Sequence, residues 1–213
     1  KTQLRALLRA SSLGKLRILL PMISDTQELA RARALMDEVK EELRTNGQAF
    51  GEDAELGVMV EVPSVALMVD RFAPHCDFLS LGTNDLTQYT LAVDRGNSKV
   101  ASLYDPFHPA VLQLIKTVAD AGVCHAKPVN ICGEMAGDPL ATVLLIGLGL
   151  NRLSLSPGLI PEVKEIIRST DSAQARRVAD ACLRMETGRE VKAYLEEMAG
   201  ESLPYWMRSE HRA

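Results

Sequence analysis

Short apolar runs along the chain alternate with longer stretches in which apolar and polar positions recur every three or four residues. Runs of the first kind are typical of strands covered on both faces, and stretches of the second kind are typical of amphipathic helices. The runs rich in Val, Ile and Leu predict five strands, at residues 16–21, 56–62, 77–83, 129–132 and 152–156. The alternation indicates an α/β fold in which helices connect parallel strands.

The helix expected between the first two strands carries sequence signals at both of its ends. Ser24 and Gln27 fit a capping box before residues 28–45, and Asn46-Gly47 fits the C-terminal end. Helical periodicity predicts further helices at residues 1–17, 64–72, 108–122, 161–168, 172–185 and 186–198, and one that begins at Asp138-Pro139. The last stretch, residues 202–213, shows no clear period.

Five strands joined by helices fit two architectures. One is an open doubly wound sheet, and the other is part of a (β/α)8 barrel. The order of elements does not choose between them. Neither GxGxxG after a strand nor GxxxxGK[ST] occurs in the chain, which disfavours a generic dinucleotide or P-loop enzyme. In both architectures ligands bind at the carboxyl ends of the strands, so a functional site is expected among the residues at those ends.

Composition narrows the class of protein. The chain has 213 residues, 46% of them apolar, which is enough for a sizeable core in one domain. A net charge of −4 gives no sign of nucleic-acid binding. Four cysteines without a CxxC pair favour a reducing cytoplasm. The longest apolar run, residues 143–150, is far shorter than the roughly 20 residues that cross a bilayer, so no membrane role is expected.

Polar residues stand at three of the predicted strand ends. Glu61 follows the second strand, Asn84 and Asp85 follow the third, and Cys132 ends the fourth. Carboxylates from different strands, directed to one edge of a sheet, suit a hard cation such as Mg²⁺, which prefers oxygen ligands and commonly takes others from a substrate phosphate. The strand ends therefore predict a site for a metal-bound anion.

Each of these residues also has a structural interpretation. Asp85 with Gln88 fits a capping pair for a following helix. Cys132 alone fits a small buried apolar residue, and Arg95 fits the end of a helix. Glu61 is harder to explain in this way, because a carboxylate within a run of Val and Met is costly to bury without a partner.

Three motifs of the chain resemble one family in the same order along the sequence. They are GVMVEVPS at residues 57–64, GTNDLTQYTLAVDRGN at 82–97, and ICGEMAGD at 131–138. Together they are similar to the phosphoenolpyruvate-binding domain of Enzyme I, the phosphoenolpyruvate-protein phosphotransferase of the bacterial sugar transport system. The resemblance covers about residues 4–168.

The resemblance implies a fold and a role for each candidate residue. The fold is a (β/α)8 TIM-type barrel. Glu61 and Asp85 would hold Mg²⁺ on the substrate's phosphate and carboxylate, and Asn84 and Arg95 would bind the phosphoryl oxygens. Cys132 would be the acid that protonates the methylene carbon as enolpyruvate becomes pyruvate. These roles agree with phosphoryl-transfer chemistry, in which positioning and cations supply most of the catalysis.

The chain also departs from the family. The strands of the barrel that precede residue 16 are missing, with the arginines that two of them supply, so the barrel is expected to be incomplete. We expect residues 1–200 to form this partial domain and residues 201–213 to form a C-terminal tail. The family passes the phosphoryl group to a histidine in a Gly-rich segment of a separate N-terminal domain, and then to the carrier protein HPr. No histidine here has that context, which predicts a fragment that cannot complete turnover alone.

Two other interpretations stay open. The resemblance extends in part to pyruvate phosphate dikinase, which shares the GTND and CGE elements. A non-catalytic dimerisation module is the other, because the family forms homodimers through this domain. A cytoplasmic protein that binds neither nucleic acid nor membrane is expected in each case.

Overall fold

A parallel sheet forms the centre of the computed structural model, which describes residues 1–202. Its strands are β1 (Arg17–Leu20), β2 (Glu55–Val60), β3 (Phe78–Gly82) and β4 (Val129–Cys132). The four strands lie in the order β1-β2-β3-β4, and each pairs in parallel with the next. A doubly wound sheet would reverse its strand order at a switch point, whereas successive barrel strands keep it. Four strands cannot close a barrel of eight, so the predicted incomplete barrel is confirmed.

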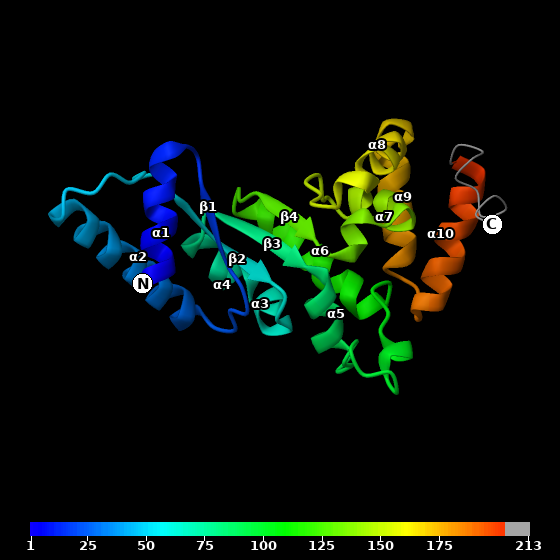
Figure 1. Ribbon diagram of the computed structural model, residues 1–213. Coiled ribbons are helices and arrows are strands. Elements are labelled where there is room, and N and C mark those ends of the chain that lie inside the picture. Colours follow the sequence, from blue (N-terminus) through cyan, green and yellow to red (C-terminus); the bar gives the residue numbers. More distant parts are fainter. Residues whose placement is uncertain (203–213) are drawn as a thin grey trace.

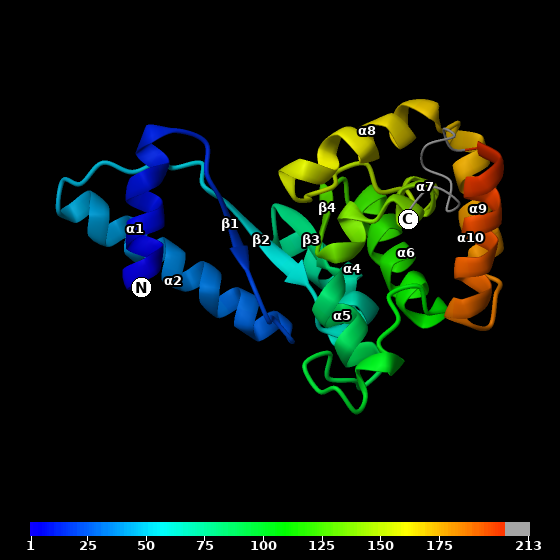
Figure 2. The same cartoon turned by 45° about the vertical axis from the view of Figure 1, so that its right-hand side comes forward.

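Helices connect the strands and continue beyond the last of them (Figure 1). Within residues 1–202 they are α1 (Thr2–Ala10), α2 (Thr26–Thr45), α3 (Pro63–Leu67), α4 (Val69–Phe72), α5 (Thr83–Thr90), α6 (Pro109–Cys124), α7 (Pro139–Gly147), α8 (Ile160–Ser169), α9 (Ser172–Cys182) and α10 (Gly188–Ser202). Helices α1 and α2 lie at one end of the molecule and α8, α9 and α10 at the other, with the sheet between them (Figures 1 and 2).

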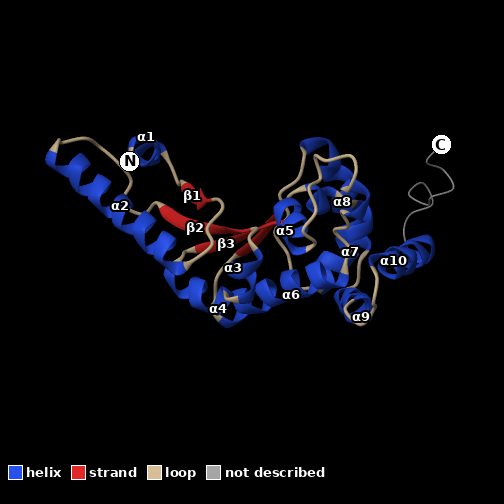
Figure 3. Ribbon diagram, turned by 90° about the horizontal axis from the view of Figure 1, so that it is seen from below, coloured by secondary structure: helices blue, strands red, loops and turns tan. Residues whose placement is uncertain are grey.

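One face of the sheet, called the outer face, is covered by helices. Figure 3 shows α2, α3, α4 and α6 along this side. Its residues alternate along each strand and are almost fully buried: Ile18, Leu56, Val58, Val60, Leu79, Leu81 and Ile131. They belong to one hydrophobic cluster with residues of the helices. Since burying one such side chain stabilises the fold by about 1.5–3 kcal/mol relative to leaving it exposed, this face is the main source of stability.

The opposite face, called the inner face, carries the other half of each strand. Its residues form three layers in register: Leu19, Gly57 and Phe78; then Met59, Ser80 and Asn130; then Glu61, Gly82 and Cys132. A pocket opens on this face and is lined by residues of β1, β3, β4 and the segment 152–154. The layer of Glu61, Gly82 and Cys132 lies at the carboxyl ends of the strands.

The N-terminus of α2 has a capping box, but not the predicted one. Asp25 is the N-cap, and its side chain accepts hydrogen bonds from the backbone N–H groups of Gln27 and Glu28. Glu28 accepts in return from the backbone N–H groups of Asp25 and Ser24. The predicted Ser24 and Gln27 pair was therefore wrong by one residue, because Asp25 and Glu28 satisfy the same spacing with a stronger acceptor at each position. Gly47, with φ 63°, follows the helix as predicted.

Two other predicted helix starts are confirmed. The side chain of His108 accepts a hydrogen bond from the backbone N–H of Ala110, and Pro109 occupies the first turn of α6. At α7 the side chain of Asp138 accepts from the backbone N–H of Leu140. Asp138 is thus a cap. The single helix predicted over residues 64–72 is divided into α3 and α4 at Met68.

The fifth predicted strand was wrong. Residues 152–156 make only an isolated parallel bridge, Ile131 with Leu153. Two hydrogen bonds form it, from the Ile131 N–H to the Arg152 carbonyl and from the Ser154 N–H to the Ile131 carbonyl. The next residues turn into a short 3₁₀ helix at Pro157, which ends the extended path before a ladder forms.

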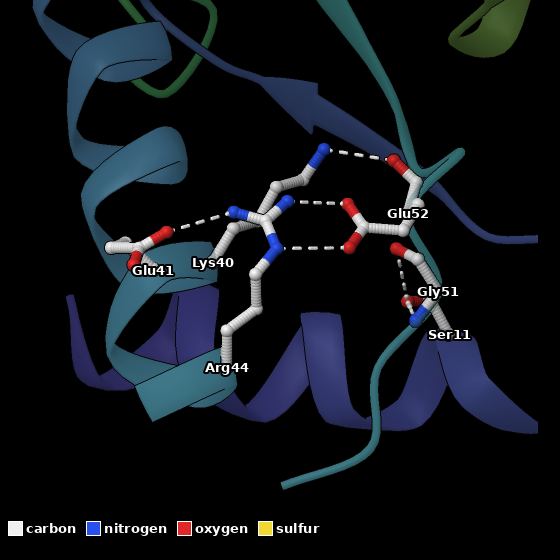
Figure 4. Close-up of polar contacts among 6 residues, drawn as sticks. All are labelled: Ser11, Lys40, Glu41, Arg44, Gly51 and Glu52. Atoms are coloured by element: carbon white, nitrogen blue, oxygen red, sulfur yellow. Dashed lines mark hydrogen bonds and ion pairs between the residues drawn. The ribbon is translucent and has the colours of Figure 1, made fainter. Parts of the chain in front are cut away.

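The loop between α2 and β2 is fixed by several polar contacts (Figure 4). Arg44 donates to both carboxylate oxygens of Glu52, at 3.1 and 2.7 Å, and Lys40 donates to the Glu52 carbonyl at 2.8 Å. The Gly51 N–H donates to the Ser11 Oγ at 2.9 Å. This bidentate contact sets where the chain enters β2. It lies before the N-terminal end of the strand, whereas Glu61 follows its C-terminal end.

The predicted helices near the C-terminus correspond to α8, α9 and α10. Helix α10 continues past residue 200 to Ser202, and the rest of the predicted tail, residues 203–213, lies outside the described residues. The division at residue 200 stays a prediction. Among residues 1–202, no helix has the length and apolar character needed to span a bilayer.

Candidate functional site

The three polar strand ends meet at one edge of the sheet, called the strand-end edge. Glu61 comes directly after β2, Asp85 lies in α5 directly after β3, and Cys132 ends β4. The carboxyl ends of parallel strands share an edge, which brings residues 61, 85 and 132 together from distant parts of the chain.

Glu61 is buried at this edge, with 4% of its surface exposed. Its Oε1 accepts a hydrogen bond from the backbone N–H of Met22 at 2.7 Å. Met22 follows β1 with a φ of 54°, which is rare for a residue with a side chain, so the backbone here is strained to direct this N–H. Burial raises the pKa of the Glu61 carboxyl, and the adjacent Asp85 carboxyl raises it further, against the lowering effect of the Met22 N–H.

Gly82 makes room for the Glu61 side chain. A Cβ on Gly82 would lie 2.9 Å from the Glu61 Cβ and 3.0 Å from its Oε2. The Glu61 carboxyl therefore passes over a residue without a side chain and reaches the neighbouring strand end. Any larger residue at position 82 would fill the space that the carboxyl occupies.

Asp85 lies in the first turn of α5 and faces Glu61. The N-cap of α5 is Gly82, and no side chain caps this helix, so the predicted capping role of Asp85 with Gln88 was wrong. The Asp85 carboxyl lies near the Glu61 carboxyl and raises its pKa, and the Arg95 Nη2 lies 3.8 Å from the Asp85 Oδ1. Two carboxyls and a guanidinium thus converge at one place.

Arg95 reaches the strand-end edge from the loop after α5. Its backbone N–H donates to the Gln88 side chain at 3.2 Å, which turns the loop back along the helix. The Arg95 side chain is 42% exposed, and its guanidinium is paired only loosely with Asp85. A part-exposed guanidinium beside an open edge can bind an incoming anion with its planar donors.

Asn84 holds the loop that follows β4. Its Oδ1 accepts from the backbone N–H of Glu134 at 3.0 Å, and the Thr83 Oγ1 donates to the Cys132 carbonyl at 3.0 Å. Gly133 lies between Cys132 and Glu134 in the chain and has a φ of 96°. A Cβ at this position would lie 2.5 Å from the Thr83 Oγ1. Residues 83 and 84 therefore fix the position of Cys132 relative to Asp85. No pattern in the sequence indicates this role for Thr83.

Cys132 is part-exposed and faces the inner face of the sheet. Its Sγ lies 3.3 Å from the Leu81 carbonyl oxygen and 3.7 Å from the Ser80 Oγ. It thus differs from Cys76 and Cys182, which are buried and whose pKa burial raises to about 11. The interpretation of Cys132 as a buried apolar residue was wrong.

Tyr104 is a site residue that sequence reasoning missed. Its hydroxyl donates to the Asn84 carbonyl at 3.4 Å. Burial is the main cause that raises the Tyr104 pKa, and the nearby carboxylates of Glu134 and Asp85 add to it. Tyr104 lies twenty residues beyond Asn84 at the end of an irregular loop. No periodicity or motif logic could place it beside α5.

The family model described as PEP-utilising enzyme, PEP-binding domain matches residues 1–172. The chain belongs to this family. The motifs that resemble the family, and the strand ends at which they stand, fall within the matched range.

Relatives of this PEP-binding domain are phosphoenolpyruvate-protein phosphotransferases. The one from Haemophilus influenzae is 46% identical over 200 residues, covering 94% of this chain and 35% of the relative. The one from Bacillus subtilis is 46% identical over 197 residues, covering 92% and 35%. The one from Staphylococcus carnosus is 44% identical over 197 residues, covering 92% and 34%. The chain thus spans about a third of the length of these relatives.

A solved structure is similar in fold. It is a citrate lyase from Burkholderia xenovorans, with a TM-score of 0.59 and 18% identity, and the match covers 94% of this chain and 68% of that one. The likeness extends over β1–β4 and their helices, which agrees with a partial parallel barrel.

The residues of the PEP-binding domain fit a divalent cation. A buried carboxyl with a raised pKa, next to a second carboxyl, is the arrangement that a bound cation would relieve. Within residues 1–202 no cluster of three or more His, Cys, Asp or Glu side chains suits a metal. Glu61 and Asp85 could therefore supply two ligands, and the others would come from water or a bound anion, as Mg²⁺ commonly requires.

Proposed function

We propose that the chain is the phosphoenolpyruvate- and Mg²⁺-binding part of a phosphoenolpyruvate-protein phosphotransferase. One observation carries the proposal: the carboxyls of Glu61 and Asp85 meet at the strand-end edge, with Arg95 3.8 Å from Asp85. The names of the relatives favour this enzyme over a pyruvate phosphate dikinase.

The carboxyls would hold the cation on the substrate. Glu61 is fixed by the Met22 N–H and Asp85 by the first turn of α5, so both oxygens are positioned before the substrate arrives. When bound, Mg²⁺ would neutralise charge on the phosphoryl oxygens as the transferring group passes through its loose transition state. Because ionised carboxyls are the better ligands, binding would also depend on the loss of the proton that burial favours on Glu61.

Arg95 and Asn84 would orient the phosphoryl group. The Arg95 guanidinium is exposed on the same side as Asp85 and can donate in parallel to two phosphoryl oxygens. The Asn84 Oδ1 accepts a hydrogen bond from the Glu134 N–H, so the N–H donors of the Asn84 side-chain amide would be the groups that bind an anion.

Cys132 would give the proton that completes pyruvate. Its thiol lies at the end of β4 in the same inner-face layer as Glu61 and Gly82. An enolate bound at the strand-end edge would present its methylene carbon toward this sulfur, and a thiol is a competent acid for an enolate.

The complete reaction would need more than this chain. We infer that the phosphoryl group passes to a histidine of an N-terminal domain of the parent protein and then to an HPr-type carrier, with the parent forming a homodimer through this domain. The chain covers about a third of its relatives, so these partners would belong to the whole protein.

Calorimetry with oxalate and Mg²⁺ tests the site, since oxalate resembles the enolate of pyruvate. Binding is expected in the unmutated chain and should be lost in Glu61→Ala and in Asp85→Ala. Asp120→Ala is a matched control, because it removes the same charge from the exposed surface of α6. Equal binding by Glu61→Ala and the parent would overturn the proposal. Self-association without any response to oxalate would instead support a dimerisation module.

A further inference from the structure

Ser80 and Cys132 lie side by side on the inner face, on neighbouring strands. Ser80 is on β3 with 4% of its surface exposed, and its Oγ lies 3.7 Å from the Cys132 Sγ. Within residues 1–202 the Ser80 hydroxyl has no other hydrogen-bond partner. A buried hydroxyl normally has a partner, so the sulfur of Cys132 is the group that satisfies it.

The two neighbours of the thiol act on it in opposite directions. The Leu81 carbonyl oxygen, 3.3 Å from the Sγ, can only accept, so the thiol donates its hydrogen bond to this oxygen. The sulfur then accepts from the Ser80 hydroxyl, which is the remaining donor. A carbonyl acceptor stabilises the protonated sulfur, whereas a hydroxyl donor stabilises the sulfur that has lost its proton.

We infer that Ser80 is a positioning residue for Cys132, which holds the sulfur in place and stabilises it when the proton leaves. The role of this proton transfer rests on the proposed function, in which Cys132 is the acid. The pairing itself does not, because it follows from the register of β3 and β4.

The surroundings of the pair fit this role. The thiol opens to the inner-face pocket, which Ser80 and Asn130 also line. Gly82 separates Cys132 from Glu61 in the layer above Ser80, so no bulky side chain holds the sulfur from that side. The Ser80 hydroxyl, in the layer below, is the group that contacts the sulfur and can hold it in place.

The pH dependence of alkylation tests the inference. The background is Cys124→Ser, which removes the exposed thiol and leaves Cys132 as the reactive one. Cys76 and Cys182 stay unreactive below pH 9, since both are buried and burial raises their pKa to about 11. The rate of carboxamidomethylation of Cys132 by iodoacetamide is measured from pH 6 to 9.5 by peptide mass spectrometry.

Ser80→Ala is expected to move the alkylation profile of Cys132 to higher pH. At pH 7.5 the rate should fall at least about tenfold, which corresponds to the loss of one hydrogen bond to a charged sulfur. Ser154→Ala is the matched control, since Ser154 lines the same pocket without contacting the sulfur, and its rate should stay within about twofold. Among the described residues the Cys132 sulfur is the one partner of this hydroxyl, so its removal should leave the fold intact.

An unchanged profile in Ser80→Ala, or an equal shift in Ser154→Ala, would overturn the inference. Calorimetry separates this result from the proposed function. Ser80→Ala should keep oxalate–Mg²⁺ binding within about threefold, since it leaves the carboxyls in place. A shifted profile in a chain that binds no oxalate would support the pairing and refute the function, and an unshifted profile with intact binding would do the reverse.

Discussion

The two faces of the sheet are built from alternate residues of the same strands, yet they differ in almost every property. The outer face is a continuous apolar surface under helices, with residues such as Val60 and Leu81 fully buried. The inner face carries Glu61, Ser80 and Cys132 as well as apolar residues such as Phe78, and a pocket opens on it. Because side chains alternate along a strand, one short segment can serve both the core and the site.

Stability and chemistry come from different faces of the sheet in this fold. Burial of outer-face side chains stabilises the sheet whatever the inner face contains. The inner face can therefore hold a buried carboxyl and a strained backbone N–H, both of which cost stability. Four sets of substitutions test whether stability and chemistry are divided between the two faces in this way.

The largest effect should come from removing an apolar side chain on the outer face. Leu79→Ala leaves a cavity under the helices and should lower the free energy of unfolding by about 2–5 kcal/mol. Leu19→Ala, the same change on the inner face, leaves no closed cavity because Leu19 lines the open pocket, and should cost less than about 1.5 kcal/mol. Urea unfolding measures both. Equal losses would mean that the faces contribute alike.

Gly82→Ala should disturb the inner face at the site. The new Cβ would lie 2.9 Å from the Glu61 Cβ, so the carboxyl or the strand must move, at a cost of about 1–3 kcal/mol. Oxalate–Mg²⁺ binding should weaken in parallel. Gly158→Ala is the control, since no atom lies within 4 Å of a Cβ there. Unaltered binding and stability in Gly82→Ala would show that Glu61 does not depend on this space.

Glu61 should make stability depend on pH in metal-free buffer. Its folded pKa is raised above the ordinary 4.5, so the folded state keeps a proton that the unfolded state releases. The free energy of unfolding should therefore fall as the pH rises from 4.5 through the raised pKa. Glu61→Gln lacks this fall and should be more stable than the parent by about 1 kcal/mol at pH 7.5.

Thermal melting between pH 4 and 8 checks this, with Asp120→Asn as the exposed control. Addition of oxalate and Mg²⁺ should reverse the order, because under the proposed function only the unmutated chain binds them. A parent curve parallel to that of Glu61→Gln over the whole range would contradict a buried, proton-holding carboxyl.

The smallest effect should come from Tyr104→Phe. It removes the hydroxyl that donates to the Asn84 carbonyl and should cost about 0.5–1.5 kcal/mol in urea unfolding. Tyr89→Phe, on the exposed side of α5, should change stability by less than about 0.5 kcal/mol. A loss as small in Tyr104→Phe as in Tyr89→Phe would show that the loop does not support the strand-end edge.

The sheet was predictable because its outer face leaves a clear pattern. Val58, Val60, Leu79 and Leu81 stand at alternate positions in short apolar runs. The same pattern at residues 152–156 misled, since Leu153 shares it but makes a single bridge. Periodicity reports which side chains can be covered, whereas the number of ladder hydrogen bonds depends on where the backbone turns.

The site was predictable only in part. Glu61, Asp85 and Cys132 became candidates because they stand at predicted strand ends and because the motifs around them resemble one family. The Met22 N–H left no signal, because a backbone donor is present in nearly every residue and only its φ of 54° directs it. Ser80 and Tyr104 act through contacts with residues distant in sequence, which no local pattern encodes.

The clamp of Arg44 on Glu52 has a consequence at the far edge of the sheet. Together with the ion pair of Arg17 and Glu55, at 2.6 Å, it determines which residue starts β2. A slip of one position would turn every side chain of the strand over and place Glu61 among the helices. Contacts on the solvent side of one end of β2 thus determine which residues stand at the strand-end edge beyond its other end.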